Sequence, residues 1–284
     1  MSSEKEYPKP PSKPTLCGYN LQLAMGLGGT GTVYKAIHPE TNQVVALKEF
    51  HANFIRNKAH LRDMAKMVKK AQKLDHPNLI KVGTLITNPD ENVLILEFID
   101  GPDLKWYMEN RPFDLNERLV ILSQICNALS YLHDHKLIHH DLKPANVLFT
   151  RQGQVKLCDF SLAGAGGGIL SFMDQGAVEQ ITPLYVAPEL IRKEKANKSC
   201  DLYSLGIMMY IMFTGQVPFG VDTLQKMYIC HLQQMPLHPT DVNAECPRLL
   251  GDIIMKLLQK DPKDRYLDCQ ELRIALANVG QSRI

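Results

Sequence analysis

The stretch HHDLKPANVLF, residues 139–149, followed by CDFS, residues 158–161, is the most specific pattern in this sequence. It contains two aspartates, Asp141 and Asp159, with an asparagine, Asn146, between them. Taken one at a time, such carboxylates are ordinary, because most aspartates lie on protein surfaces and are solvated. Their meaning therefore depends on whether the rest of the chain supplies matching motifs in the right order.

A glycine-rich run with the sequence MGLGGTGTV occupies residues 25–33. Its G-x-G-x-x-G-x-V pattern lets backbone N–H groups approach phosphates, because glycine has no Cβ to obstruct them. Alone the pattern is weak evidence, since a glycine-rich hairpin turn has the same appearance. Downstream, VALK at residues 45–48 resembles a strand in which Lys48 can point at phosphates while Ala46 leaves room for a flat base. The distance between the two runs suits a hairpin that brings Lys48 beneath the glycine loop.

Together these segments resemble the protein kinase family, in its serine/threonine class. The resemblance runs from about Tyr19 to Leu276, with the motifs in the family's order and with similar spacings. It implies a two-lobed α+β fold, with a small β-rich N-lobe that contains one main helix and a larger, mostly helical C-lobe. It also implies transfer of the γ-phosphoryl group of ATP to a serine or threonine hydroxyl of a protein substrate, with Mg²⁺ as the metal.

The resemblance assigns roles residue by residue. Asp141 would orient the acceptor hydroxyl, and Lys143 resembles the lysine that serine/threonine kinases place on the γ-phosphate. Asn146 and Asp159 would hold Mg²⁺ against the phosphates. Lys48 is expected to act on the phosphates as well. The expected catalytic set is therefore Asp141, Lys143, Lys48 and, in the peptide-docking segment, Thr182.

The resemblance also implies that the glycine loop, the following strand and a hinge segment bind the nucleotide. Leu96 would be the gatekeeper before this hinge. Asp103 would reach the ribose or a basic substrate side chain, or would remain a solvated loop carboxylate. The expected nucleotide-binding residues are Met25, Gly26, Leu27, Gly28, Gly29, Thr30, Gly31, Thr32, Val33, Ala46, Lys48, Glu97, Ile99 and Leu148.

Three further segments resemble structural supports of the family. TPLYVAPE at residues 182–189 resembles the substrate-docking loop with its A-P-E motif. DLYSLG at residues 201–206 resembles a buried helix. Arg265 matches the arginine that pairs with the A-P-E glutamate, here Glu189.

Three positions depart from the family pattern. Met67 occupies the place of a glutamate that pairs with the strand lysine, and a thioether cannot accept a charge-assisted hydrogen bond. Asp63, one turn earlier, would substitute only if the helix shifted. His140 replaces an arginine that commonly clamps a phosphate on the activation segment, which weakens the case for activation by phosphorylation there. Ser161 replaces the glycine of D-F-G and removes some backbone freedom.

The departures leave an alternative open. The first hypothesis is an active serine/threonine kinase; the alternative is a pseudokinase, a nucleotide-binding or scaffolding module that signals by its shape. A small-molecule phosphotransferase is disfavoured, because the segment at residues 182–189 resembles a peptide-docking loop.

Composition limits the remaining classes. Among 284 residues, 32 basic and 30 acidic side chains give a net charge of +2, with no long single-sign block, so we expect no nucleic-acid partner. No apolar stretch reaches the roughly 18 to 20 residues of a membrane span, so none is expected. The seven scattered cysteines, without a C-x-x-C pair, favour a reducing cytoplasm. The oligomeric state is not predicted.

The pattern along the chain divides it into three parts. Residues 1–17, rich in Pro, Lys and Ser, are expected to form a disordered tail. Residues 18–99 are expected to form the ATP-binding N-lobe, with short β-rich runs and one helical stretch over residues 58–74. Residues 100–281 are expected to form the C-lobe, where Asp114 and Glu117 make a capping box ahead of a helix.

Overall fold

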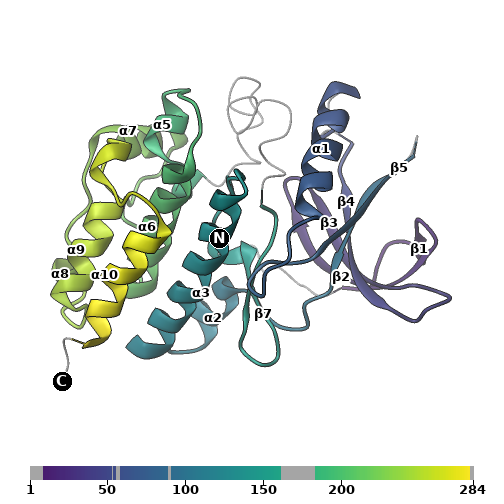
Figure 1. The fold of residues 1–284 in the computed structure, drawn as a ribbon, viewed down its shortest axis with the longest axis horizontal. Helices are drawn as coiled ribbons and strands as arrows, with labels where there is room; N and C mark the ends of the chain where they lie inside the picture. The colour runs from purple at the N-terminus through teal and green to yellow at the C-terminus, as the bar shows by residue number, and fades with distance from the viewer. Residues whose placement is uncertain (1–8, 53, 56–57, 89–90, 161–182, 282–284) are drawn as a thin grey trace. The chain divides into compact units, whose positions relative to one another are not determined.

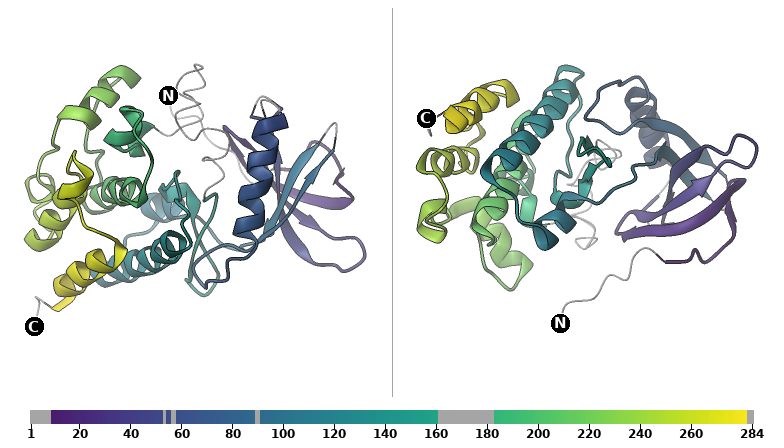
Figure 2. Two further views of the ribbon diagram at one scale, coloured as in Figure 1. Left: turned by 45° about the horizontal axis from the view of Figure 1, so that its top comes forward. Right: turned by 90° about the horizontal axis from the view of Figure 1, so that it is seen from below.

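The computed structural model describes residues 9–52, 54–55, 58–88, 91–160 and 183–281. The chain is grouped in two compact units (Figures 1 and 2). The first contains Met1–Asp75 and Leu79–Asp100, and the second contains His76–Asn78 and Gly101–Ile284. Within the described ranges, no helix is long and apolar enough to cross a membrane.

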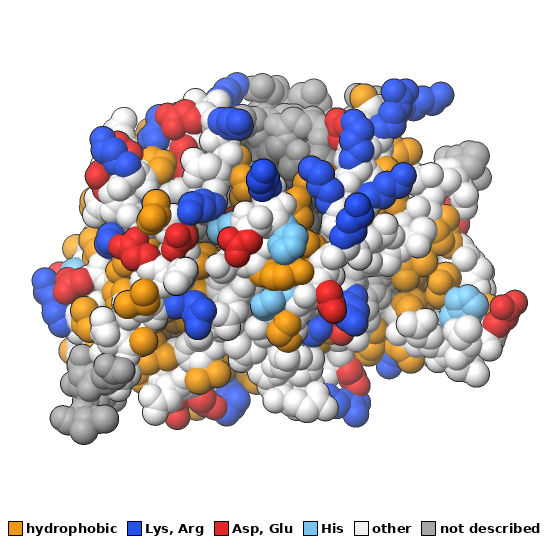
Figure 3. Space-filling model, in the orientation of Figure 1, with side chains coloured by type: hydrophobic (Ala, Val, Ile, Leu, Met, Phe, Trp, Pro, Cys, Tyr) orange, Lys and Arg blue, Asp and Glu red, His pale blue; other side chains and the backbone are white. Residues whose placement is uncertain are grey.

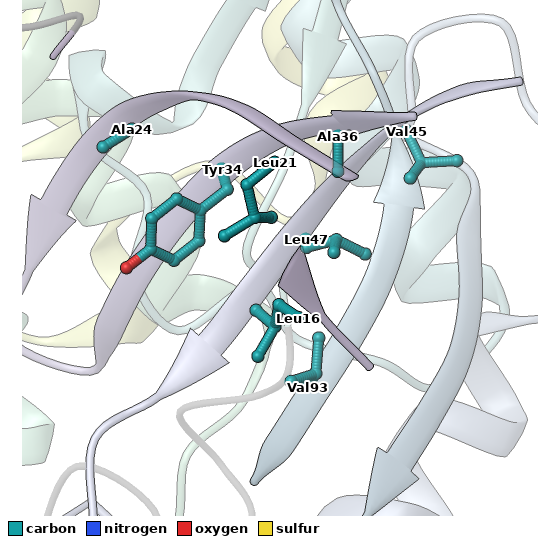
Figure 4. Packing of buried hydrophobic residues seen from close by; sticks show 8 residues of the cluster. All are labelled: Leu16, Leu21, Ala24, Tyr34, Ala36, Val45, Leu47 and Val93. Carbon is teal, nitrogen blue, oxygen red and sulfur yellow. The ribbon is translucent and has the colours of Figure 1, made fainter. Parts of the chain in front are cut away.

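The first unit is built on a six-stranded antiparallel sheet in the order β1-β2-β3-β4-β6-β5. Side chains of a strand alternate between its two faces, so Val45 and Leu47 point to one face while Ala46 and Lys48 point to the other. The first face carries a compact apolar core (Figure 4). This core consists of Leu16, Leu21, Ala24, Tyr34, Ala36, Val45, Leu47 and Val93. The strands are β1 (Thr15–Leu16), β2 (Tyr19–Gly28), β3 (Gly31–Ile37), β4 (Val44–Phe50), β5 (Val82–Thr87) and β6 (Asn92–Glu97).

The end of the expected tail is ordered, which corrects the prediction of disorder for residues 9–17. Strand β1 pairs with β2, and Lys9 exchanges backbone hydrogen bonds with Ala24 at 3.1 and 2.8 Å. Leu16 is 1% exposed because its side chain fills the core beside β2. Composition alone missed this, since one buried leucine and a backbone ladder are enough to order a short polar segment. Residues 1–8 lie outside the described residues.

Helix α1 (Lys58–Ala71) is the one long helix in the described part of the first unit, and it packs near β5. Its buried residues are His60, Met64, Val68 and Ala71, a helical spacing that places them on one face. Lys and Arg side chains gather over this helix on its outer side (Figure 3). The helix ends before the predicted Leu74, where the chain continues in hydrogen-bonded turns.

The second unit is mainly helical. The capping box predicted at the start of α3 is confirmed, because Asp114 Oδ1 accepts from the Glu117 N–H and Glu117 Oε2 accepts from the Asp114 N–H. Helix α6 is buried along almost its whole length and packs against α9, while α3 packs against α10. The helices are α2 (Leu104–Asn110), α3 (Leu115–Asp134), α5 (Pro188–Ile191), α6 (Lys198–Thr214), α7 (Leu224–Gln233), α8 (Pro239–Val242), α9 (Arg248–Leu257) and α10 (Cys269–Gln281).

Shorter elements lie between these helices. They are the hairpin β7 (Val147–Phe149) and β8 (Val155–Leu157), and the 3-10 turns η1 (Pro144–Asn146), η4 (Pro183–Tyr185) and η5 (Pro262–Asp264). The hairpin and η1 position the two predicted metal ligands, Asn146 and Asp159.

Candidate active site

The β7–β8 hairpin places Asn146 and Asp159 at the same end. Asn146 is the last residue of η1, directly before β7, and Asp159 follows β8 after Cys158. Because the strands are antiparallel, with Val147 opposite Leu157, the chain enters and leaves the hairpin at one end. The Cys158 N–H donates to the Asn146 carbonyl at 3.0 Å and extends the ladder by one step. Two candidate oxygen ligands are therefore fixed by the same short sheet.

Asp141 is held by two neighbours. Lys143 Nζ lies 2.7 Å from Asp141 Oδ2, and Asn146 Nδ2 donates to the same oxygen at 3.0 Å. The Asn146 amide also donates to the Asp141 backbone carbonyl at 2.7 Å. These bonds use the amide nitrogen of Asn146 and turn its oxygen away from Asp141. The Asp141 side chain is 27% exposed, so a substrate hydroxyl can reach its carboxylate.

Asp201, near the start of α6, holds the loop that carries Asp141. Its Oδ2 accepts from the His139 backbone N–H at 2.9 Å, and its Oδ1 accepts from the His140 backbone N–H at 3.0 Å. His133 Nε2 lies 2.8 Å from Oδ2. Asp201 is 1% exposed, and its burial alone would raise its pKa, but the hydrogen bond and charge of His133 outweigh burial and lower it.

His140 has a left-handed backbone, with φ of 70°, which a non-glycine residue adopts only when its surroundings hold it there. The bond from its N–H to Asp201 supplies that restraint. Burial lowers the pKa of the imidazole, so the ring is neutral near pH 7. Among the residues that the structure describes, none forms a hydrogen bond with His140 Nδ1. The position therefore lacks the fixed cation that the family's arginine would supply.

The His133–Asp201 pair predicts a pH-dependent stability. Burial opposes the charge on His133, but the hydrogen bond and charge of Asp201 outweigh it and raise the pKa of the imidazole from 6.5 to about 9. Because the folded-state pKa lies above the unfolded value, the pair stabilises the native state fully below pH 6.5 and loses this contribution as the pH rises through about 9.

We expect the wild type to exceed His133→Gln in free energy of unfolding by about 3 kcal/mol near pH 6, and by much less near pH 10. Urea unfolding of both proteins across this range measures the difference, and the titration of groups that do not contact residue 133 cancels in it. A difference that stays constant with pH would mean that His133 is neutral in the native protein.

In the first unit, strand register gathers several expected nucleotide-binding residues on one face of the sheet. Lys48 lies opposite Val33 on β3 and opposite Leu94 on β6, and Ala46 lies opposite Leu96. Cross-strand partners share a face, so these side chains lie on the side of the sheet away from the core in Figure 4. Lys48 is 4% exposed.

The glycine-rich run spans the end of β2, the turn at residues 29–30 and the start of β3. A Cβ at Gly31 would collide with the backbone carbonyl of Glu49 on β4, so this glycine allows β3 and β4 to approach closely. A Cβ at Gly26 would meet nothing, and one at Gly28 would make only an ordinary contact with Gly31. Met25 and Leu27 are exposed apolar side chains on the same strand, which is consistent with a loop that contacts a ligand.

The remaining residues that we expected to bind the nucleotide lie in different kinds of surroundings. Glu97 Oε2 accepts from the Lys81 backbone N–H at 2.9 Å, and Ile99 is buried. Leu148 lies on β7 in the second unit, where it forms a bridge with Asp103. Asp103 itself caps α2, since its Oδ1 accepts from the Trp106 N–H at 2.7 Å. Ser161 and Thr182 lie outside the described residues.

Met67, which stands on α1 in place of the family's glutamate, is half-buried beside the apolar face of the helix. Asp63, the alternative partner considered for Lys48, lies 2.9 Å from Lys66 on the outer side of the same helix. This ion pair gives Asp63 a local partner and does not support a role near the phosphates.

The predicted pair between Arg265 and Glu189 is confirmed. Arg265 Nη1 and Nη2 each donate to one oxygen of Glu189 at 2.8 Å, and both side chains are almost completely buried. Burial alone would raise the pKa of Glu189, but Arg265 outweighs this and lowers it. The bidentate pair ties α5 to the segment after η5.

Sequence reasoning missed the role of Asp201 in the catalytic loop and did not select His133. A signal existed, because Asp201 is an acidic residue in an otherwise apolar helical run, and a buried charge requires a partner. The partner could not be named from the sequence, since His133 lies 68 residues away.

Known proteins match this architecture. The protein kinase domain family matches residues 19–273. A probable serine/threonine-protein kinase of Clostridium perfringens (strain 13 / Type A) is 32% identical over 262 residues, which cover 89% of this chain and 37% of that protein. The serine/threonine-protein kinase PrkC of Bacillus subtilis (strain 168) is 29% identical over 255 residues, covering 89% of this chain and 39% of that protein.

Solved structures agree on the fold. The Mycobacterium tuberculosis PknI kinase domain superimposes with a TM-score of 0.74 at 24% identity, covering 93% of this chain and 97% of that one. The chain therefore belongs to the protein kinase domain family, and the predicted two-lobed fold is confirmed. It spans about two fifths of the length of the curated relatives that it matches.

Proposed function

We propose that this chain is an active serine/threonine kinase that transfers the γ-phosphoryl group of ATP to a protein hydroxyl. One observation carries the proposal: Asp141, Lys143 and Asn146 are joined by hydrogen bonds, and the hairpin that starts after Asn146 ends beside Asp159. This is the set that phosphoryl transfer to a hydroxyl requires, since it provides an acceptor for the hydroxyl proton, a cation and two metal ligands.

Each of these groups has its own role in the proposed reaction. Asp141 orients the serine or threonine hydroxyl of the acceptor and takes its proton as the oxygen attacks the γ-phosphorus. Lys143, already 2.7 Å from Asp141, balances negative charge on the transferred group. Lys48 and the glycine loop hold the phosphates of ATP. The bond between the γ-phosphorus and the bridging oxygen breaks, and ADP leaves.

The residues present fit a magnesium ion. Asn146 and Asp159 offer an amide oxygen and a carboxylate, the hard ligands that Mg²⁺ prefers, and the amide nitrogen of Asn146 is already occupied by Asp141. Within the described part of the chain, no group of three or more His, Cys, Asp or Glu residues could hold a metal. Such a site would draw its other ligands from ATP and water, and the ion would neutralise charge on the phosphates.

We expect Mg²⁺ and ATP together to raise the melting temperature, because a ligand that binds only the native state stabilises it. Asp159→Ala should abolish the part of this shift that depends on Mg²⁺. Thermal unfolding with ATP alone, Mg²⁺ alone and both, on wild type and variant, tests the metal assignment. No shift at millimolar concentrations would favour the pseudokinase alternative.

Met67→Glu tests the largest departure from the family. If residue 67 faces Lys48, the new carboxylate supplies a charged hydrogen bond worth roughly 1.5 to 3 kcal/mol, and kcat/KM should rise about tenfold or more. Met67→Gln, which is similar in length but uncharged, is the control. A joint fall in activity and melting temperature would mean instead that Met67 packs in an apolar site where a carboxylate is buried unpaired.

The proposed partners are ATP and a protein substrate. The proposed setting is the cytoplasm, because the reaction uses ATP and the scattered cysteines suit a reducing compartment. Phosphate incorporation into a generic protein acceptor, identified as phosphoserine or phosphothreonine and absent in Asp141→Asn, would test the function as a whole.

A further inference from the structure

Three polar side chains of the second unit form a buried cluster that the proposed reaction does not use. Tyr203 Oη, on α6, lies 2.9 Å from His231 Nδ1 on α7 and 3.4 Å from Lys260 Nζ. Tyr203 and His231 are both fully buried. Polar groups are costly to bury unless they are hydrogen-bonded, so an arrangement of this kind calls for an explanation. These residues are called the Tyr203 cluster below.

In the cluster, Lys260 donates a hydrogen bond to Tyr203, and Tyr203 donates one to His231. An ammonium group can only donate, so Lys260 donates to Tyr203 Oη and to the Cys230 carbonyl at 3.2 Å. The Tyr203 hydroxyl donates a hydrogen bond to His231 Nδ1, which acts as the acceptor. Burial, with the charge of Lys260, lowers the pKa of His231 to about 4, so the imidazole is neutral and carries one proton. That proton lies on Nε2.

His231 links the cluster to the peptide-docking segment, because η4 contacts its helix, α7. The backbone carbonyl of Pro183 interacts with the His231 imidazole and acts to raise its pKa. Within the described residues, His231 Nε2 is buried and forms no hydrogen bond.

The turn η4, which begins at Pro183, contacts both α6 and α7. Ser204, the neighbour of Tyr203 on α6, donates from Oγ to the Tyr185 carbonyl at 2.7 Å. The other end of the docking segment is linked to the same ring, because the Arg265 guanidinium lies 4.9 Å from the centre of the Tyr203 ring while it bonds Glu189. The η4 end of residues 183–189 is therefore bonded to Ser204, and the Glu189 end is bonded to an arginine that lies over the Tyr203 ring.

We propose that Tyr203, His231 and Lys260 are positioning residues that fix η4 and thereby set the affinity for the protein acceptor, without acting in phosphoryl transfer. None of them contacts Asp141, Lys143, Asn146 or Asp159 in the hydrogen bonds described above. The kinetic consequence rests on the proposed kinase function, whereas the restraint on η4 does not.

Tyr203→Phe is the sharpest test, because it removes one hydroxyl oxygen and keeps the ring that packs against Arg265. Tyr210→Phe, on the same helix and also buried but outside the cluster, is the matched control. A net hydrogen bond is worth up to about a tenfold change in affinity. With a peptide chosen from a library randomised around one central serine, we expect the KM for peptide to rise about five- to tenfold in Tyr203→Phe alone. The kcat and the KM for ATP should stay within about twofold.

A second readout does not need activity. The Val186 N–H donates to the Pro183 carbonyl at 3.4 Å, so amide exchange at residues 184–186 reports on η4. We expect about tenfold faster exchange there in Tyr203→Phe and in His231→Phe, beyond any change that the variants cause in the rest of the second unit. His231→Gln, which retains a donor and an acceptor, should restore slow exchange in part.

Unchanged exchange at residues 184–186 in Tyr203→Phe, or an equal change in Tyr210→Phe, would overturn the inference. A fall in kcat of the same size as the rise in KM would also overturn it, because the cluster would then act on the chemical step. If the wild type phosphorylates no peptide of the library, the proposed function fails, and amide exchange still decides whether the cluster restrains η4.

Discussion

Replacement of Asp141 by asparagine is expected to lower kcat by about 10²- to 10⁴-fold while leaving the affinity for ATP nearly unchanged. Asparagine has nearly the same shape and can still bond Lys143 or Asn146 through its amide oxygen, but it cannot take the proton of the acceptor hydroxyl. The loss therefore falls on the chemical step. Steady-state kinetics with a serine peptide, beside calorimetric titration with Mg²⁺ and ATP, separates the two effects.

Asp134→Asn is the control, because Asp134 is an exposed carboxylate at the end of α3. It does not belong to the hydrogen-bonded group of Asp141, Lys143 and Asn146. This variant should retain wild-type turnover. If Asp141→Asn proves as active as the wild type, the measured phosphorylation came from a contaminating kinase, and the role proposed for Asp141 is wrong.

Replacement of Arg265 by alanine is expected to lower the free energy of unfolding by about 3 to 5 kcal/mol, because it leaves the buried Glu189 carboxylate without its partner. Arg265 also donates to the carbonyls of Ser199 and Gln259, so three segments lose a shared donor. Urea unfolding measures the effect. The slope of the transition should stay the same if the native state remains compact.

The matched control is Arg192→Ala. Arg192 Nε lies 2.6 Å from Glu194, but the two side chains are 35% and 51% exposed, so solvent screens the pair. Its loss should cost less than about 1 kcal/mol. Similar small losses in both variants would mean that the buried pair contributes little net stability and that Glu189 becomes protonated when Arg265 is removed.

Local pattern was enough for individual elements of the fold. The helix start at Asp114 was predictable, because a capping box is complete within four residues and depends on no distant contact. The expectation that Ala46 and Lys48 face the same ligand needed only the alternation of side chains along one strand, β4. The pair of Glu189 with Arg265 was found only through the resemblance, since no local pattern links residues so far apart. The roles of the predicted site residues themselves stay predictions.

Tertiary structure decided the rest. The sequence by itself determined the order of the motifs and the residue types available for chemistry, and its resemblance to the protein kinase family implied the two-lobed fold. Only the folded chain revealed that Leu16 fills the core of the first sheet, that Asp201 holds the loop before Asp141, and that Tyr203 joins His231 to Lys260. Each of these contacts joins segments distant in sequence, and a buried polar group selects its partner by where packing places it, which spacing does not encode.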